Sequence, residues 1–112
     1  MNMEIQELIN KYSIEIQELF IELRKLITQS VSCEINEKLW AKLPSYYVGE
    51  RFIRIIPFKD HINIEAKGII EYKEELDGFK ITPKGMLQIY LNQNIPCDVL
   101  QNIFKVTLLG ND

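Results

Sequence analysis

The chain has 112 residues, of which 46% are hydrophobic and 26% charged, the size and composition of one globular domain, 1–112. The net charge of -3, without a dominant basic patch, argues against a nucleic-acid partner. No apolar stretch approaches the roughly 20 residues that a membrane span needs, and the first residues lack a signal-peptide pattern. We therefore expect a cytoplasmic protein with no membrane partner and with reduced thiols.

Two helices are predicted before the first strand, over 3–11 and 14–29. Apolar residues recur at helical spacing in both, and Ser13 is a suitable N-cap for the second. Ile14 and Ile21 fall on the outer side of the second helix, where the first helix or a partner would cover them. Its core side carries Ile16, Leu19, Phe20, Leu23, Leu26 and Ile27.

A strip of three glutamates, Glu15, Glu18 and Glu22, follows one side of this second helix. Residues three or four apart are neighbours on a helix, so these carboxylates repel one another, and Lys25 offsets their charge only partly. Carboxylate oxygens suit hard cations. The strip is therefore interpreted either as a metal-binding site or as a solvated helix face.

Strands are predicted from runs of β-branched residues and from alternation of apolar and polar residues. Pro44 is expected to end the first strand because proline cannot donate to a ladder, and 45–50 is expected to be a loop. The four predicted strands are 35–41, 51–57, 61–66 and 87–91.

A tight hairpin is predicted between the second and third of these strands, with Lys59 and Asp60 as its loop. A two-residue loop sets Arg54 opposite Glu65. This register is favoured because it matches opposite charges across the strands.

Beyond the third strand, a short helix is predicted over 69–76, with Gly78 closing it in a left-handed conformation. A loop at 82–85 leads to the fourth strand. A last helix opens near Pro96, since proline suits the first turn of a helix. Its core stripe is Val99, Leu100, Ile103, Phe104, Thr107 and Leu108.

Recognisable catalytic motifs are missing from the chain, and a single histidine excludes a multi-histidine metal site within it. Cys33 or Cys97 with His61 would make a thiolate pair only if the fold brought them together, so both cysteines are expected to be buried and inert. His61 is interpreted as a hydrogen-bonded structural residue rather than a ligand or base. We therefore expect no enzymatic activity and no catalytic residues.

Segments in chain order carry a family resemblance: LRKLI at 23–27, EKLWAKLPSYY at 37–47, IPFKDHINIEAKG at 56–68, YKEELDGFK at 72–80, PKG at 83–85 and IPCDVLQNIFK at 95–105. Together they resemble the YdhG-like family of small bacterial proteins, over about 5–108. Many members have Tyr-Gly-Met-Pro where this chain has Ala41-Lys42-Leu43-Pro44. The resemblance implies an α+β fold, with a four-stranded antiparallel sheet packed by N-terminal and C-terminal helices.

The resemblance also implies a function. Members are often described as frataxin-like iron chaperones, which supply iron for iron–sulfur cluster or haem assembly. This implies weakly held, exchangeable iron, and partners among the proteins of those assembly pathways. In frataxins the iron surface is an acidic ridge on a helix, and the corresponding residues here are Glu15, Glu18 and Glu22, with Glu4 and Glu7 as further candidates.

A competing hypothesis is a non-enzymatic module that binds a small anionic ligand or an acidic partner segment in a basic and aromatic cleft. It predicts that Lys59 and Lys84 share one mouth with His61 and Tyr46. The alternative is that the tyrosines complete the core and the lysines are solvated. The six residues of the expected cleft are Lys42, Tyr46, Tyr47, Lys59, His61 and Lys84.

Overall fold

The computed structural model describes residues 1–110. Its helices are α1 (Met3–Ile9), α2 (Ile14–Gln29), the 3₁₀ helix η1 (Lys67–Glu75) and α3 (Cys97–Leu109). Its strands are β1 (Asn36–Trp40), β2 (Leu43–Val48), β3 (Arg51–Pro57), β4 (His61–Ala66), β5 (Lys80–Ile81) and β6 (Leu87–Tyr90).

The strands form one antiparallel sheet in the order β1-β2-β3-β4-β6-β5. The α+β class and the helices at both ends agree with the expectation, but the sheet has six strands rather than four. Within residues 1–110, none of the helices combines the length and apolar character that crossing a bilayer requires.

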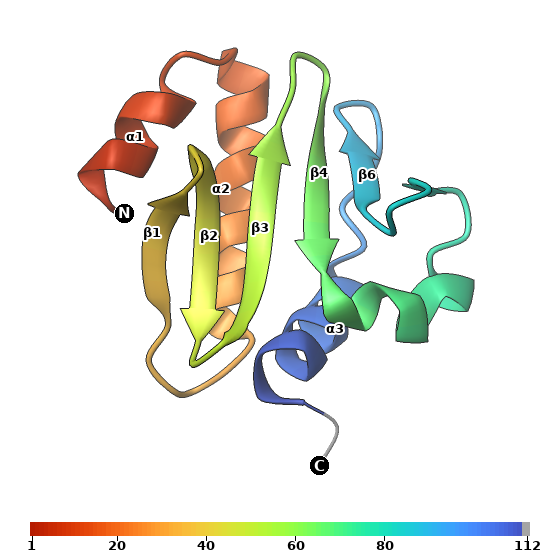
Figure 1. Ribbon diagram of the computed structural model, residues 1–112. Helices are drawn as coiled ribbons and strands as arrows, with labels where there is room; N and C mark the ends of the chain where they lie inside the picture. The colour runs from red at the N-terminus through yellow and green to blue at the C-terminus, as the bar shows by residue number, and fades with distance from the viewer. Residues whose placement is uncertain (111–112) are drawn as a thin grey trace.

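The molecule has two layers, because α2 and α3 lie behind the sheet and the face toward the viewer in Figure 1 carries no helix. We call this helix-free side the open face. It is built by the residues that alternate with the core residues along each strand. They are Lys38, Trp40, Ser45, Tyr47, Phe52, Arg54, Ile56, His61, Asn63, Glu65, Gln88 and Tyr90.

The core lies between the sheet and the helices and consists mainly of isoleucine, leucine and phenylalanine. The predicted stripes of α2 and α3 supply the helix side, where Phe20 and Phe104 are fully buried. Ile53, Ile55 and Ile64 supply much of the sheet side. Side-chain alternation therefore divides each central strand between the core and the open face.

Several local predictions are confirmed. The bounds of α2, β3 and β4 are those expected, and the Ser13 hydroxyl accepts a hydrogen bond from the Ile16 N–H as an N-cap. Arg54 pairs with Glu65 across β3 and β4, as the two-residue hairpin loop requires. These features rest on short-range patterns, which one segment carries by itself.

The loop expected at 45–50 is wrong, because β2 runs through most of it. Pro44 does not end a strand but lies inside β2, opposite Leu39 of the edge strand β1. The pairing of β2 with β3 begins only at Ser45, so Pro44 lies where β2 has a free side and proline is tolerated. The turn before it is formed by Ala41 and Lys42, which both have positive φ and carry no glycine or asparagine signal.

The region after β4 also differs from its prediction. The helix expected at 69–76 is the 3₁₀ helix η1, and it begins earlier. The short strand β5 was not expected, and it pairs with β6 at the sheet edge. Gly78 has a φ of +88°, in keeping with its predicted left-handed role. A strand of two residues is too short to leave a periodic signal, so only its pairing reveals it.

Candidate functional site

Arg54 lies at the centre of an aromatic cluster on the open face. Its guanidinium carbon is 3.9 Å from the ring centroid of Trp40 and 3.8 Å from that of Phe52. Its Nη2 donates to the Tyr47 hydroxyl at 3.1 Å, and its Nη1 is 3.5 Å from Glu65 Oε1. Residues from four strands thus hold one guanidinium, and cation–π attraction contributes about 0.5–2 kcal/mol at such contacts.

The surrounding side chains cover Arg54 almost completely, so that only 7% of it is exposed. Its Nε is buried without a hydrogen-bond partner among residues 1–110, and so is Asn63 Oδ1 on the same face. A buried polar group left unpaired costs roughly 1–3 kcal/mol. This cost offsets part of the gain from the cation–π contacts and hydrogen bonds of Arg54, and it makes the open face a candidate functional surface.

A second cluster lies at the β3–β4 hairpin. The ring centroid of His61 is 4.7 Å from that of Phe58 and 4.6 Å from that of Tyr90, with both pairs stacked. His61 Nδ1 is 2.8 Å from Asp60 Oδ1, and this hydrogen bond lowers the pKa of the Asp60 carboxyl. These contacts agree with the structural interpretation of His61. They also extend the aromatic surface across the sheet.

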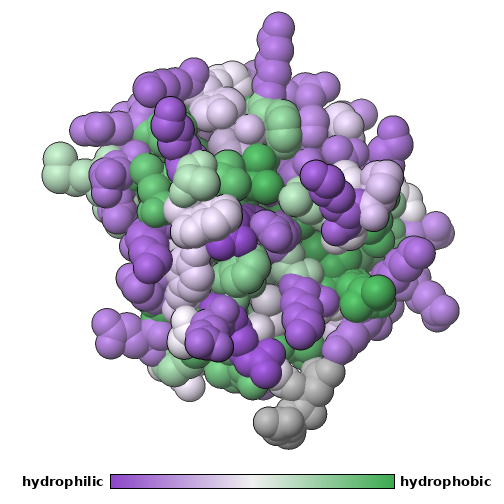
Figure 2. Space-filling view, viewed as in Figure 1, coloured by the Kyte–Doolittle hydropathy of each residue, from purple (hydrophilic) through white to green (hydrophobic). Residues whose placement is uncertain are grey.

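The open face leaves large apolar side chains in contact with solvent. Trp40 is 51% exposed and Phe58 is 41% exposed. In Figure 2, green and pale side chains lie across the middle of this face among hydrophilic ones, and further hydrophilic side chains project around its rim. The face therefore combines exposed rings with charged groups, the composition of a recognition surface rather than of a purely solvated one.

The six residues of the expected cleft are only partly brought together. Tyr47 and His61 lie on the open face, and Lys42 and Lys59 occupy the β1–β2 and β3–β4 turns at one end of the sheet. Tyr46 is fully buried on the core side, opposite Ile53. Its burial raises the pKa of its hydroxyl.

The single mouth expected for Lys59 and Lys84 is not formed. Lys59 lies just before His61, which is opposite Tyr90 at the last residue of β6. Lys84 lies before Leu87, the first residue of β6, so it is near the other end of that strand. The two lysines therefore lie at opposite ends of the sheet. Strand order and direction decide this distance, and neither can be read from the local sequence around either lysine.

The glutamate strip lies on the outer side of α2, where Glu15, Glu18 and Glu22 are all exposed. Within residues 1–110, no three His, Cys, Asp or Glu side chains are grouped closely enough to hold a metal ion. Cys33 and Cys97 are exposed free thiols, so the expectation that both are buried is wrong. They lie before β1 and in the first turn of α3, both outside the core.

Comparison of the chain with protein-family models, curated proteins and solved structures finds no match. The YdhG-like resemblance therefore stays a prediction from the sequence segments.

Sequence reasoning missed most of the open face. It selected Tyr47 and His61 but omitted Trp40, Phe52 and Arg54 as site residues. Alternation in β3 would have placed Phe52 and Arg54 on one side, together with Ile56. The missing information was that no helix covers that side.

Proposed function

We propose that this protein is a non-catalytic binding module whose open face holds an acidic polypeptide segment with apolar anchor residues. The observation that carries the proposal is the Arg54 cluster, in which an exposed Trp40 ring is stacked on a guanidinium and held in place. Pre-positioned tryptophan, tyrosine and arginine side chains are the residues that dominate binding energy in protein interfaces.

The charges around the open face favour an acidic partner. Two of its cations lie toward opposite edges of the sheet. Lys38 of β1 has its Nζ 4.8 Å from the Tyr47 ring centroid, and Lys80 of β5 lies opposite Gln88 of β6 in the strand register. Lys42 and Lys59 add two positive charges at the β1–β2 and β3–β4 turns, and the negative charges nearby are those of Asp60 and Glu65. This surface is thus cationic in a chain with a net charge of -3. Complementary charge speeds encounter with an acidic segment and selects against basic ones.

A nucleic acid is a weaker fit to the same surface. Its affinity rests on many phosphate contacts, whereas Arg54 is buried and its Nη1 and Nη2 face Glu65 and Tyr47. The exposed carboxylates Glu15, Glu18 and Glu22 on α2 would also repel a long polyanion. An acidic polypeptide segment needs only a few of these cations to balance its charge, and most of its binding energy would come from contact with the aromatic rings.

Selection from a phage-displayed random peptide library tests this proposal. We expect enriched peptides to be acidic with aromatic or aliphatic anchors, and to shift amide resonances of β1, β3 and β4 in NMR spectra. Trp40→Ala should weaken the binding of a selected peptide about thirtyfold, the effect of losing an interface hot spot of about 2 kcal/mol.

Matched controls come from exposed apolar residues outside the open face. Ile14 is 63% exposed and Ile70 is 77% exposed, so Ile14→Ala and Ile70→Ala remove surface apolar area without touching the proposed site. Neither should change peptide affinity. The proposal is wrong if the selected peptides are not acidic, if they shift only residues of α2, or if single-stranded poly(U) binds the face more tightly than any peptide.

We also propose, from the family resemblance, that exchangeable iron binds the strip of Glu15, Glu18 and Glu22 for delivery to iron–sulfur cluster or haem assembly. The supporting observation is that all three carboxylates are exposed and outside any ion pair described in residues 1–110. They are not grouped around a common point, so the proposal requires their side chains to turn toward the ion when it binds. Exposed carboxylates with open coordination positions would release iron readily.

An anaerobic Fe(II) titration followed by NMR tests the iron proposal. Weak binding should broaden the resonances of α2 first, and changing Glu15, Glu18 and Glu22 together to Gln should abolish it. The control changes Glu50, Glu74 and Glu75 to Gln, which removes the same charge from exposed positions elsewhere. Binding that survives the first triple change would reject the site, and a complete lack of binding would reject the iron function.

A further inference from the structure

The strand β1 forms one edge of the sheet. It pairs with β2 on one side and stands first in the strand order, so within residues 1–110 no strand lies along its other side. Figure 1 shows β1 at the border of the sheet, on the side away from β6. The main chain of an edge strand can pair with a strand of another chain.

The β1–β2 turn decides which main-chain groups of β1 point outward. Both of its residues have positive φ, as in tight two-residue hairpin loops, so the flanking Trp40 and Leu43 bond to each other. Bonded and non-bonded pairs alternate along an antiparallel ladder, which makes Leu39 and Glu37 members of non-bonded pairs. Pro44 lies opposite Leu39 and has no N–H to donate, in agreement with this assignment.

The N–H and C=O groups of Glu37 and Leu39 therefore face the free edge. Within residues 1–110, none of the hydrogen bonds described outside the strand ladders reaches the main chain of either residue. The start of α1 bonds to the Glu37 side chain instead, since the Asn2 N–H donates to Glu37 Oε1. Two donors and two acceptors on alternate residues match the hydrogen-bonding repeat of an added strand.

Lys38, between these two residues, makes a second copy of β1 a poor occupant of the edge. Two copies related by a twofold axis pair antiparallel. They use all the outward groups of Glu37 and Leu39 only if each Lys38 lies opposite its equivalent. Like charges directly opposite each other are destabilising, and lysine on an edge strand is a common protection against self-pairing. An acidic residue at the same position would instead attract Lys38.

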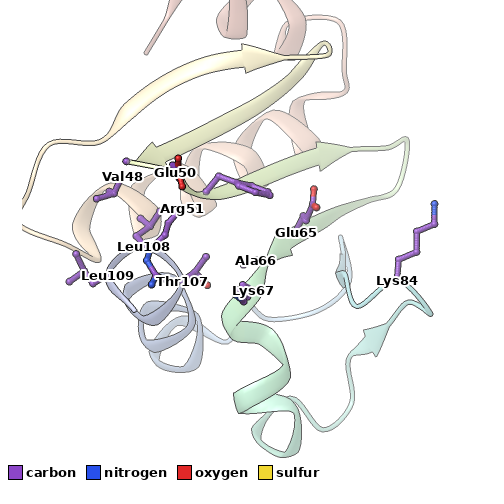
Figure 3. Close-up of a pocket in the computed structure, with 12 residues that line it drawn as sticks. Val48, Glu50, Arg51, Glu65, Ala66, Lys67, Lys84, Thr107, Leu108 and Leu109 are labelled. Atoms are coloured by element: carbon purple, nitrogen blue, oxygen red, sulfur yellow. The ribbon is translucent and has the colours of Figure 1, made fainter. Parts of the chain in front are cut away.

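The surrounding charges agree with an acidic occupant. Lys38 is exposed on the open face and outside any ion pair described in residues 1–110. The Glu37 carboxylate lies on the core side, where it pairs with Arg24, and α1 with its glutamates also packs on that side. Glu34 and Glu50 lie beyond the first residue of β1. Glu50 is in the β2–β3 turn, where it lines a cavity of about 900 Å³ (Figure 3).

We infer that an acidic segment binds in extended conformation as an added strand on the free edge of β1, held by the main chain of Glu37 and Leu39. This inference rests on the proposed function and names how the same segment is held. Residues directly opposite on paired strands point to the same face. An acidic residue of the segment would therefore lie beside Lys38, and an apolar residue two positions away would lie against the Trp40 ring.

N-methylation of a bound peptide tests the inference. The probe is the tightest-binding acidic peptide from the phage selection, made in versions with one N-methyl group at each successive position. Only every second N–H of an added strand points to β1, so binding should weaken at least about tenfold at alternate positions and little in between. Small effects at every position, with binding intact, would overturn the inference and leave the proposed function standing.

Hydrogen exchange of the full chain gives a second readout. In the free chain, the amides of Glu37 and Leu39 should exchange faster than that of Lys38, which bonds to β2. Saturation with the peptide should slow Glu37 and Leu39 at least about tenfold. Slow exchange of both in the dilute free chain would overturn the inference. Protection that rises with protein concentration in the absence of peptide would assign the edge to a second copy instead.

Charge reversal tests the contact with Lys38. Lys38→Glu should weaken the acidic peptide about fivefold, because like charges would then lie opposite each other. Lys105→Glu makes the same change at an exposed position of α3 and should leave the affinity unchanged. Equal losses in the two variants would show an effect of net charge alone and would overturn the inference. Failure of every selected peptide to bind would reject the proposed function and the inference together.

Discussion

Gly68→Ala is expected to destabilise the fold by about 2–3 kcal/mol, because the β4–η1 junction leaves no room for a Cβ. A Cβ at this position would be 2.8 Å from the Ile103 carbonyl oxygen and 2.9 Å from Thr107 Oγ1. Neither neighbour can withdraw easily. The Gly68 N–H donates to Thr107 Oγ1 at 2.9 Å, and that hydroxyl donates to the Ile103 carbonyl at 2.7 Å.

Thermal and urea unfolding measure the effect, and the midpoint temperature should fall by roughly 10 °C. Gly49→Ala is the matched control, because Gly49 has a φ of +61° but no atom within 4 Å of an added Cβ. That change costs only the left-handed backbone strain of about 1 kcal/mol. Equal losses in the two variants would show that η1 and α3 do not approach as closely as described.

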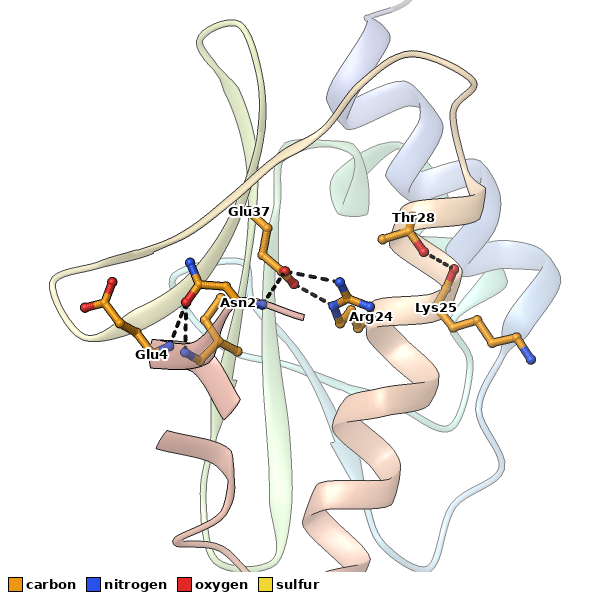
Figure 4. A network of polar contacts seen from close by, with 7 residues as sticks. Asn2, Glu4, Arg24, Lys25, Thr28 and Glu37 are labelled. Atoms are coloured by element: carbon orange, nitrogen blue, oxygen red, sulfur yellow. Dashed lines mark hydrogen bonds and ion pairs between the residues drawn. The ribbon is translucent and has the colours of Figure 1, made fainter. Parts of the chain in front are cut away.

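Arg24→Met is expected to destabilise the fold by about 2 kcal/mol at neutral pH, between the values for exposed and fully buried ion pairs. Arg24 Nε donates to Glu37 Oε2 at 2.6 Å and Nη2 donates to Oε1 at 3.1 Å. The Asn2 N–H donates to the same Oε1 at 3.1 Å. Figure 4 shows how this carboxylate links α2, β1 and the start of α1. Methionine keeps the packing but leaves the carboxylate without its cation.

The effect should depend on pH. Burial of Glu37 raises its pKa, but the hydrogen bonds from Arg24 and Asn2 outweigh this and hold the pKa below its usual range. A lowered pKa in the folded state stabilises the protein above the ordinary glutamate pKa of about 4.3, and this contribution is lost as the pH falls through the folded value. Arg24 is the largest of the groups that lower this pKa, so we expect the pKa of Glu37 to rise when Arg24 is removed.

Urea unfolding at pH 7 and pH 4 measures this dependence. The difference in stability between the native chain and Arg24→Met should therefore shrink toward pH 4. The double variant Arg24→Met, Glu37→Gln should be more stable at pH 7 than Arg24→Met alone, because no charge is left buried. A stability difference that is constant with pH, or a double variant no more stable than the single one, would contradict this account of the ion pair.

The sequence by itself determined the features that one segment carries. The helical period of α2, its Ser13 cap and the β3–β4 hairpin register all follow from residues within a few positions of one another. It failed where local signals are weak. Pro44 predicts the end of a strand, and the Ala41-Lys42 turn lacks the usual residues for positive φ, so the local pattern predicts a loop where β2 lies and too few strands in the sheet.

Only the tertiary structure decided which side chains meet. The Arg54 cluster draws its residues from β1, β2, β3 and β4, and the ion pair between Arg24 and Glu37 joins α2 to β1. Lys59 and Lys84 were expected together but lie at opposite ends of the sheet. Distances of this kind follow from strand order and from which sheet face the helices cover. Both are set by the packing of the whole core, so no short stretch of sequence encodes them.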